Sequence, residues 1–239
     1  MASEYLKWKY RDVTREEQAE RSPAEKRKNW WHYHKWHVMI CVVLAAIGIS
    51  LTCSVLGVGQ IKPDYQVAYV GESALPDDTA AAIETAFAAL GEDLNGDGRV
   101  TVRLNQYPTG GADPNLAAAS QTTLMGDLLE CESCFFLLED PVWFQVNYHT
   151  LCRLDGSLPE EADYSAEGTY LPWTGCPTLA GMELGDYSYQ LLSETVSGSS
   201  DELASGLYLA RRGFWTEKTA PYPEGCEALW NELTKGAAG

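Results

Sequence analysis

Residues 38–58 read VMICVVLAAIGISLTCSVLGV, an apolar run of 21 residues without a charged side chain. A helix rises about 1.5 Å per residue, so this run is long enough to cross a hydrocarbon core of about 30 Å. We therefore expect a transmembrane helix at residues 38–58. This stretch divides the chain and decides its domain organisation.

The sequence before this run is basic, and it is aromatic close to the run. Residues 1–37 carry nine Lys or Arg against six Asp or Glu, and Trp30, Trp31, Tyr33 and Trp36 precede the span directly. Basic flanks stay cytoplasmic, and amphipathic rings favour the headgroup layer. We expect residues 1–37 to form a cytoplasmic tail with a membrane collar, ahead of an uncleaved signal anchor. Lipidation at Cys53 is a minor alternative anchor.

The sequence after the run is strongly acidic. Residues 60–239 contain eight Lys or Arg against 28 Asp or Glu, a net charge of −20. Such a surface repels nucleic acid and anionic membranes, so we expect neither as a partner of this part. Cations, basic peptides and neutral small molecules stay open as partners. About 180 residues suffice for one well-cored domain, which the predicted topology places outside the cell.

After a linker at residues 59–64, strand and helix patterns alternate. We expect strands at residues 65–70, 100–105 and 134–138, with helices at 77–90 and 115–129 between them. This order predicts right-handed crossovers and a mainly parallel sheet with helices on its faces. The expected fold class of residues 65–239 is therefore α/β. In its second half we expect a helix at 142–151, an acidic loop at 155–168, a strand at 207–210 and a closing helix at 224–234.

The segment Asp93-Leu-Asn-Gly-Asp-Gly-Arg-Val100 resembles the first half of an EF-hand or dockerin calcium loop. Oxygen-bearing side chains occupy positions one, three and five, Gly follows at six, and a carbonyl is available at seven. The predicted Ca²⁺ ligands are Asp93, Asn95, Asp97, Arg99 and Thr101.

Position twelve of this loop is Leu104, where a calcium loop has a bidentate Glu. A missing carboxylate would have to come from elsewhere, with Glu92 and Asp77 as candidates. The alternative is a plain turn between a helix and a strand, in which the glycines supply positive φ angles. Both interpretations stay open from the sequence.

Five of the seven cysteines lie outside the apolar run, an odd number, so at least one is free or pairs with another chain. Cys176 and Cys226 both lie in loops rich in Gly or Pro, and we expect a disulfide between them. Three of the others, together with His149, have the ligand types of a zinc site. An apolar strand between them makes disulfides or free thiols the better interpretation.

Loops after the first and second strands share the carboxyl edge of a parallel sheet, where open α/β folds bind ligands. The residues expected to line a crevice there are Tyr69, Glu72, Ser73, Tyr107 and Thr109. Each is otherwise an ordinary loop residue. No nucleophile or phosphate-binding motif occurs, so we expect no catalytic residues. Paired acids such as Asp77-Asp78 leave hydrolysis as a third function class.

Two resemblances bear on function. The strand and helix order of residues 65–140 resembles one lobe of an extracellular solute-binding protein. The segments WWHYHKWHV, LPDDTAA, DLNGDGRV, FFLLEDP and GLYLARRGFW resemble a group of uncharacterised, membrane-anchored bacterial surface proteins. The first resemblance implies an extracellular domain that binds a ligand, and the second implies only that the chain is anchored at the membrane. The alternative is a structural or assembly subunit that binds another surface protein.

Overall fold

The computed structural model describes residues 23–55, 62–111, 114–160, 163–191, 194–214 and 217–237. Three parts of the predicted segments lie outside the described residues: residues 1–22 of the tail predicted at 1–37, residues 56–58 of the span, and residues 59–61 of the linker predicted at 59–64. The chain divides into two units, with a boundary between residues 61 and 62.

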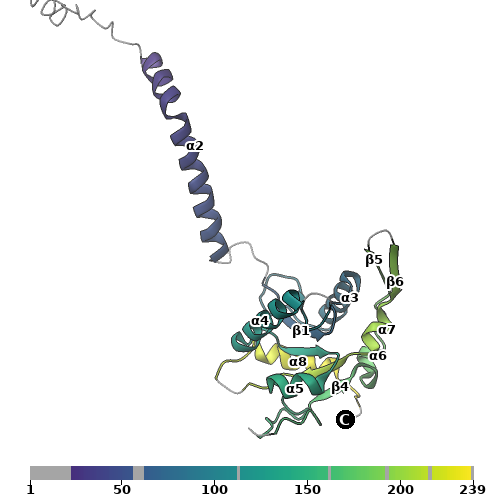
Figure 1. Cartoon of the computed structure of the whole chain (residues 1–239). Helices are drawn as coiled ribbons and strands as arrows, with labels where there is room; N and C mark the ends of the chain where they lie inside the picture. The colour runs from purple at the N-terminus through teal and green to yellow at the C-terminus, as the bar shows by residue number, and fades with distance from the viewer. Residues whose placement is uncertain are drawn as a thin grey trace, which may run out of the picture. The chain divides into compact units, whose positions relative to one another are not determined.

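The described part of the first unit is one long helix, α2 (Pro23–Val55), seen in Figure 1. Its segment Arg27–Thr52 is long and apolar enough to cross a membrane, and none of its most apolar stretch is buried within the chain. The aromatic collar belongs to the same helix, where the rings of Trp30 and His34 stack with centroids 4.9 Å apart. The helix fits a single-pass membrane anchor, whereas its orientation stays a prediction.

The second unit is a mixed α/β domain built on a five-stranded sheet in the order β2-β1-β3-β7-β4. The strands are β1 (Tyr65–Gly71), β2 (Val102–Pro108), β3 (Phe135–Leu138), β4 (Tyr170–Pro172) and β7 (Tyr208–Arg211). β1 pairs in parallel with β2 and β3, whereas β7 is antiparallel to β3 and β4. The predicted α/β class with parallel strands is confirmed for β1, β2 and β3. The direction of β7 was not predictable, because an apolar strand pattern carries no direction.

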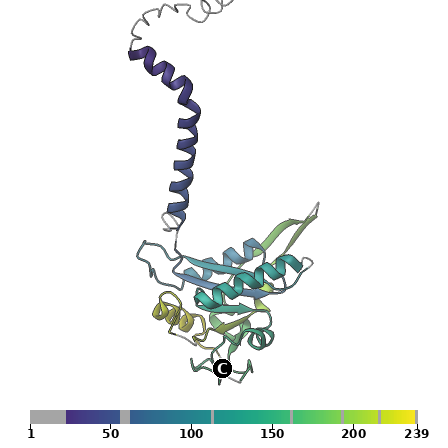
Figure 2. The same cartoon turned by 60° about the vertical axis from the view of Figure 1, so that its left-hand side comes forward.

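Helices cover both faces of the sheet, as the two views in Figures 1 and 2 show. Helices α3 (Asp77–Ala88) and α8 (Pro223–Leu233) pack with Val67 and Phe135 in one core. Helices α4 (Pro114–Glu130) and α5 (Pro141–Tyr148) pack with Ala68 and Phe136 in the other core. Neighbouring residues of a strand point to opposite faces, so one apolar strand supplies both cores.

The second half of the domain contains elements that the sequence pattern did not predict. They are η1 (Trp173–Gly175), α6 (Pro177–Ala180), β5 (Asp186–Leu191), β6 (Glu194–Ser199) and α7 (Ser200–Ser205). β5 and β6 form a separate hairpin that extends away from the sheet in Figures 1 and 2. Its amide at Ser188 donates to Asp78 of α3 over 3.1 Å. The hairpin escaped prediction because its side chains are mostly polar.

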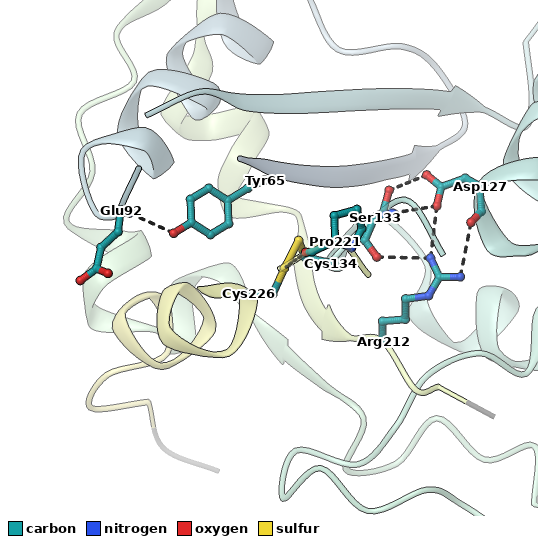
Figure 3. The surroundings of a disulfide bond; sticks show 8 residues. All are labelled: Tyr65, Glu92, Asp127, Ser133, Cys134, Arg212, Pro221 and Cys226. Atoms are coloured by element: carbon teal, nitrogen blue, oxygen red, sulfur yellow. Dashed lines mark hydrogen bonds and ion pairs between the residues drawn. A yellow bond between two sulfur atoms is a disulfide. The ribbon is translucent and has the colours of Figure 1, made fainter. Parts of the chain in front are cut away.

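A disulfide joins Cys134, which directly precedes β3, to Cys226 in α8, as Figure 3 shows. The predicted pairing of Cys176 with Cys226 is therefore wrong, and Cys176 is a buried free thiol. The packing of α8 explains the difference. Trp230 lies edge-on to Phe135 with ring centroids 6.0 Å apart, which brings Cys226 to the start of β3.

Replacing Cys226 with Ser should lower the free energy of unfolding by about 2–5 kcal/mol, because the disulfide closes a long loop between residues separated by 92 positions. Chemical denaturation measures this change. Cys176→Ala removes a buried thiol that belongs to no disulfide, so it should lower the free energy of unfolding by less. Peptide mapping without reductant should recover residues 134 and 226 in one linked pair, and a link between 176 and 226 would contradict the structure.

Candidate functional site

At the carboxyl edge of the sheet, where a crevice is predicted, the exposed residue Glu139 bonds to two of the predicted lining residues. One carboxylate oxygen accepts a hydrogen bond from the Tyr69 hydroxyl at 2.6 Å, and the other accepts from the Glu72 amide at 2.7 Å. Burial, together with the bond to Glu139, raises the pKa of Tyr69. A Cβ at Gly71 would come within 2.6 Å of the Glu139 carboxyl carbon. Glu139 therefore holds the two strand ends together.

The five residues predicted to line this crevice separate into two groups. Tyr69, Glu72 and Ser73 surround Glu139, because the Tyr69 hydroxyl also lies 2.9 Å from the Ser73 carbonyl oxygen. Tyr107 instead donates its hydroxyl to Asp127 of α4 at 2.8 Å. Thr109 donates its hydroxyl to the Gly71 carbonyl at 3.0 Å. Glu139 was missed, although an acid directly after an apolar strand is a signal that could have found it.

The predicted calcium loop is ordered by hydrogen bonds from its own backbone. The Asp93 carboxylate accepts from the amides of Gly96 at 2.7 Å and Gly98 at 2.8 Å. The Asn95 side-chain oxygen accepts from the Asp97 amide, and Asp97 accepts from the Arg99 amide, both at 2.9 Å. Among the described residues, no group of three Asp, Glu, His or Cys side chains is placed to hold a metal ion.

A carboxylate outside the predicted ligand set completes this loop. Asp64 is buried, and one of its oxygens accepts from the amides of Leu94 at 2.8 Å and Asn95 at 2.9 Å. Its other oxygen accepts from the Thr101 amide at 2.8 Å. Leu104, at position twelve, is buried in β2. Asp64 could not be assigned to the loop from the sequence, because it lies about 30 residues before it.

Arg211 and Arg212, adjacent at the end of β7, point toward different surroundings because strand residues alternate between faces. Arg212 is buried and lies 3.2 Å from the Asp127 carboxylate. Arg211 lies 5.9 Å above the ring of Trp230 and forms an ion pair with Glu227 of α8. Arg211 therefore faces α8, and Arg212 faces α4.

Asp127 is the centre of a buried polar cluster, shown in Figure 3. Its carboxylate accepts from Arg212, from the Ser133 amide at 3.0 Å and from the Tyr107 hydroxyl. Arg212 also donates to the Leu128 carbonyl at 2.6 Å. Removing one partner of such a pair leaves an uncompensated buried charge, which costs about 3–5 kcal/mol. The cluster joins α4 to the end of β7 and has a structural role.

A cavity of about 290 Å³ lies beside the disulfide, between the start of β3, the end of β7 and α8. The cavity therefore lies at the amino end of β3, whereas the crevice was predicted at the carboxyl end. Its apolar and aromatic walls come from Phe135, Leu158, Phe214, Ala220, Pro223 and Trp230. Arg211 and Glu227 supply opposite charges on the wall, and Arg212, which also lines the cavity, is paired with Asp127. The contact of Arg211 with α8 is not visible in the sequence, because Glu227 lies 16 residues further along the chain.

The free thiol of Cys152 lines the same cavity as the disulfide. Burial raises the pKa of Cys152 to about 11, although the nearby charge of Arg211 opposes this effect. Since the thiolate is the nucleophile, we expect Cys152 to react slowly near neutral pH.

Asp78 of the pair Asp77-Asp78 and Asp140 of the pair Glu139-Asp140, two acids of paired carboxylates, have structural partners. Asp140 caps α5 by accepting from the Trp143 amide at 2.8 Å, and Asp78 accepts from the β5 hairpin. Comparisons with protein-family models, with curated proteins and with solved structures found no match to this chain. Any proposal for the function therefore starts from the structure of the described domain.

We expect Cys152 to be alkylated slowly near pH 8 in the folded chain, and faster as the pH approaches 11. The sign follows from burial, which favours the neutral thiol, so that thiolate forms only at high pH. Iodoacetamide labelling followed by peptide mass spectrometry measures the rate. The unfolded chain is the control and should react readily near pH 8. Equal rates for folded and unfolded chains near pH 8 would contradict this expectation.

Proposed function

We propose that this protein is a membrane-tethered extracellular domain that binds a small ligand, with the cavity beside α8 as its site. The observation that carries the proposal is the ion pair of Arg211 and Glu227 on the wall of a partly aromatic cavity. Ligand sites are concave, largely apolar, and carry a few polar groups that orient the ligand. The apolar helix α2 supports the tether.

The two charges suggest the class of ligand. A guanidinium binds a carboxylate through paired hydrogen bonds, and a carboxylate binds an ammonium group. The side chains of Arg211 and Glu227 are 22% and 46% exposed, so a ligand can reach both. A small zwitterion, such as a free amino acid, would replace their mutual contact with one contact to each. Its apolar part would lie against Trp230 and Phe135.

Thermal shift with a panel of free amino acids tests this function on the full chain. At least one should raise the melting temperature, and Arg211→Gln should weaken its binding by about tenfold or more, because a hydrogen bond to a charged group contributes about 1.5–3 kcal/mol. Glu227→Gln should weaken it as well.

Arg153→Gln is the matched control for this experiment, because it removes a surface ion pair with Asp163 that lies outside the cavity. It should leave binding unchanged. Amino-acid binding that survives both cavity substitutions would show that the site lies elsewhere, and a complete lack of binding would remove the proposed ligand class.

Calcium stays a prediction for the Asp93 loop. If the loop binds Ca²⁺, excess calcium should raise the melting temperature relative to chelator, and Asp97→Ala should abolish the difference. Asp97 is the chosen position because its carboxylate accepts only one of the loop hydrogen bonds described above, from the Arg99 amide. An unchanged melting temperature would mean that the loop binds no calcium and is ordered by the hydrogen bonds of Asp64 and Asp93 alone.

The alternative function, a subunit that binds another protein, is favoured by a different observation. Helices α4 and α5 expose large apolar side chains, and their one exposed charged residue is Glu130 at the end of α4. Exposed apolar surface of this kind is typical of protein contacts.

A further inference from the structure

The disulfide between Cys134 and Cys226 forms part of the wall of the cavity beside α8 (Figure 3). The two residues are only 7% and 8% exposed, so the domain covers most of their surface. Both of them nevertheless line the cavity. The cavity is therefore a route by which a small molecule can reach a sulfur–sulfur bond that is otherwise covered.

The charged groups of the cavity lie next to both ends of this bond. In the antiparallel pairing of β3 with β7, Arg211 lies opposite Phe135, the residue that follows Cys134. Glu227 directly follows Cys226 in α8. The ion pair of Arg211 with Glu227 therefore joins positions adjacent to the two disulfide-bonded residues. A zwitterion that replaced this ion pair with its own two contacts would lie beside the disulfide.

A third sulfur lines the same cavity. The amide of Cys152 donates to the Arg211 carbonyl at 3.0 Å, and its thiol donates to the Arg212 carbonyl at 3.4 Å. Burial raises the pKa of this thiol to about 11, so it stays neutral near neutral pH. Because a thiolate is needed to attack a disulfide, Cys152 leaves the neighbouring bond intact. The attacking thiolate has to come from a ligand.

We propose that the cavity carries out thiol–disulfide exchange with small zwitterionic thiols, of which free cysteine is the simplest. The ligand thiolate attacks one sulfur of the disulfide between Cys134 and Cys226, and a new sulfur–sulfur bond to the ligand forms as the old bond breaks. The ligand sulfur is oxidised, the protein sulfur that leaves is reduced, and the leaving thiolate takes up the proton that the ligand thiol lost. The step needs no oxidant or reductant besides the ligand.

The charges of the cavity decide which thiols react fastest. Exchange rates depend on access to the disulfide as well as on the thiolate fraction of the attacking thiol. An uncharged thiol has no group for Arg211 or Glu227 to bind, and an amine thiol without a carboxylate has none for Arg211. Cysteine has both groups, so binding places its sulfur at the bond and makes the attack effectively intramolecular. This inference rests on the proposed amino-acid site and adds a covalent step to it.

The rate at which the disulfide opens in the full chain, in detergent and without oxygen, tests the proposal. Reduced cysteine, cysteamine and 2-mercaptoethanol are the probes, timed samples are quenched with N-ethylmaleimide, and peptide mapping measures the linked pair that is left. Each rate is divided by the rate for the unfolded chain, which removes the intrinsic reactivity of the thiol. This ratio should be about tenfold or more higher for cysteine than for 2-mercaptoethanol, because hydrogen bonds to charged groups hold only cysteine. Cysteamine should lie between the two.

Two further measurements assign this preference to the cavity. Arg211→Gln should remove most of the preference for cysteine, whereas the matched control Arg153→Gln, outside the cavity, should keep it. Circular dichroism shows that each variant is folded. Serine has the charges of cysteine but no thiol, so an excess of serine should slow the opening of the native disulfide by cysteine. This competition needs no variant.

Equal ratios for cysteine and 2-mercaptoethanol overturn the exchange, and so does a preference that neither Arg211→Gln nor serine reduces. The thermal-shift experiment separates this failure from failure of the proposed function. If free amino acids raise the melting temperature but cysteine shows no preference, the ligand site stands and the exchange is wrong. If no amino acid raises the melting temperature and cysteine shows no preference, both proposals are wrong.

Discussion

The buried charge of Arg212 is the constraint on which the arrangement of the domain depends. A guanidinium inside a core needs a carboxylate and further acceptors, and Asp127 and the Leu128 carbonyl of α4 supply them. This fixes the end of β7 against α4. The neighbouring Arg211 must then point to the other face, where it meets Trp230 and Glu227 of α8. The disulfide at Cys134 and Cys226 holds α8 at the same place, so the cavity has a rigid frame.

Many of the acids that make this domain so negative accept hydrogen bonds from backbone amides. Asp64 and Asp93 order the loop before β2, Glu139 joins two strand ends, and Asp140 caps α5. A carboxylate that satisfies amide donors stabilises a turn without any ion. Oxygen-bearing residues at regular spacing therefore predict a calcium loop and a hydrogen-bonded turn equally well, and only the partners of each oxygen separate the two.

The two surfaces that bear on function lie on different sides of the sheet. The cavity is lined by α8 and the ends of β3 and β7, whereas the exposed apolar side chains of α4 and α5 lie on the other side. Association through α4 and α5 would therefore leave the cavity open to a ligand.

The sequence by itself determined the apolar helix and the elements of the parallel core, because the patterns of residues 38–58 and 65–138 are local and strong. It also placed α8 within one residue at each end. Only the tertiary structure decided the partner of Cys226, the bonds of Glu139 to Tyr69 and Glu72, and the separate roles of Arg211 and Arg212. Each of these depends on which distant segment packs against the residue. Spacing along the chain carries no such information, since long-range contacts are set by the packing of whole elements.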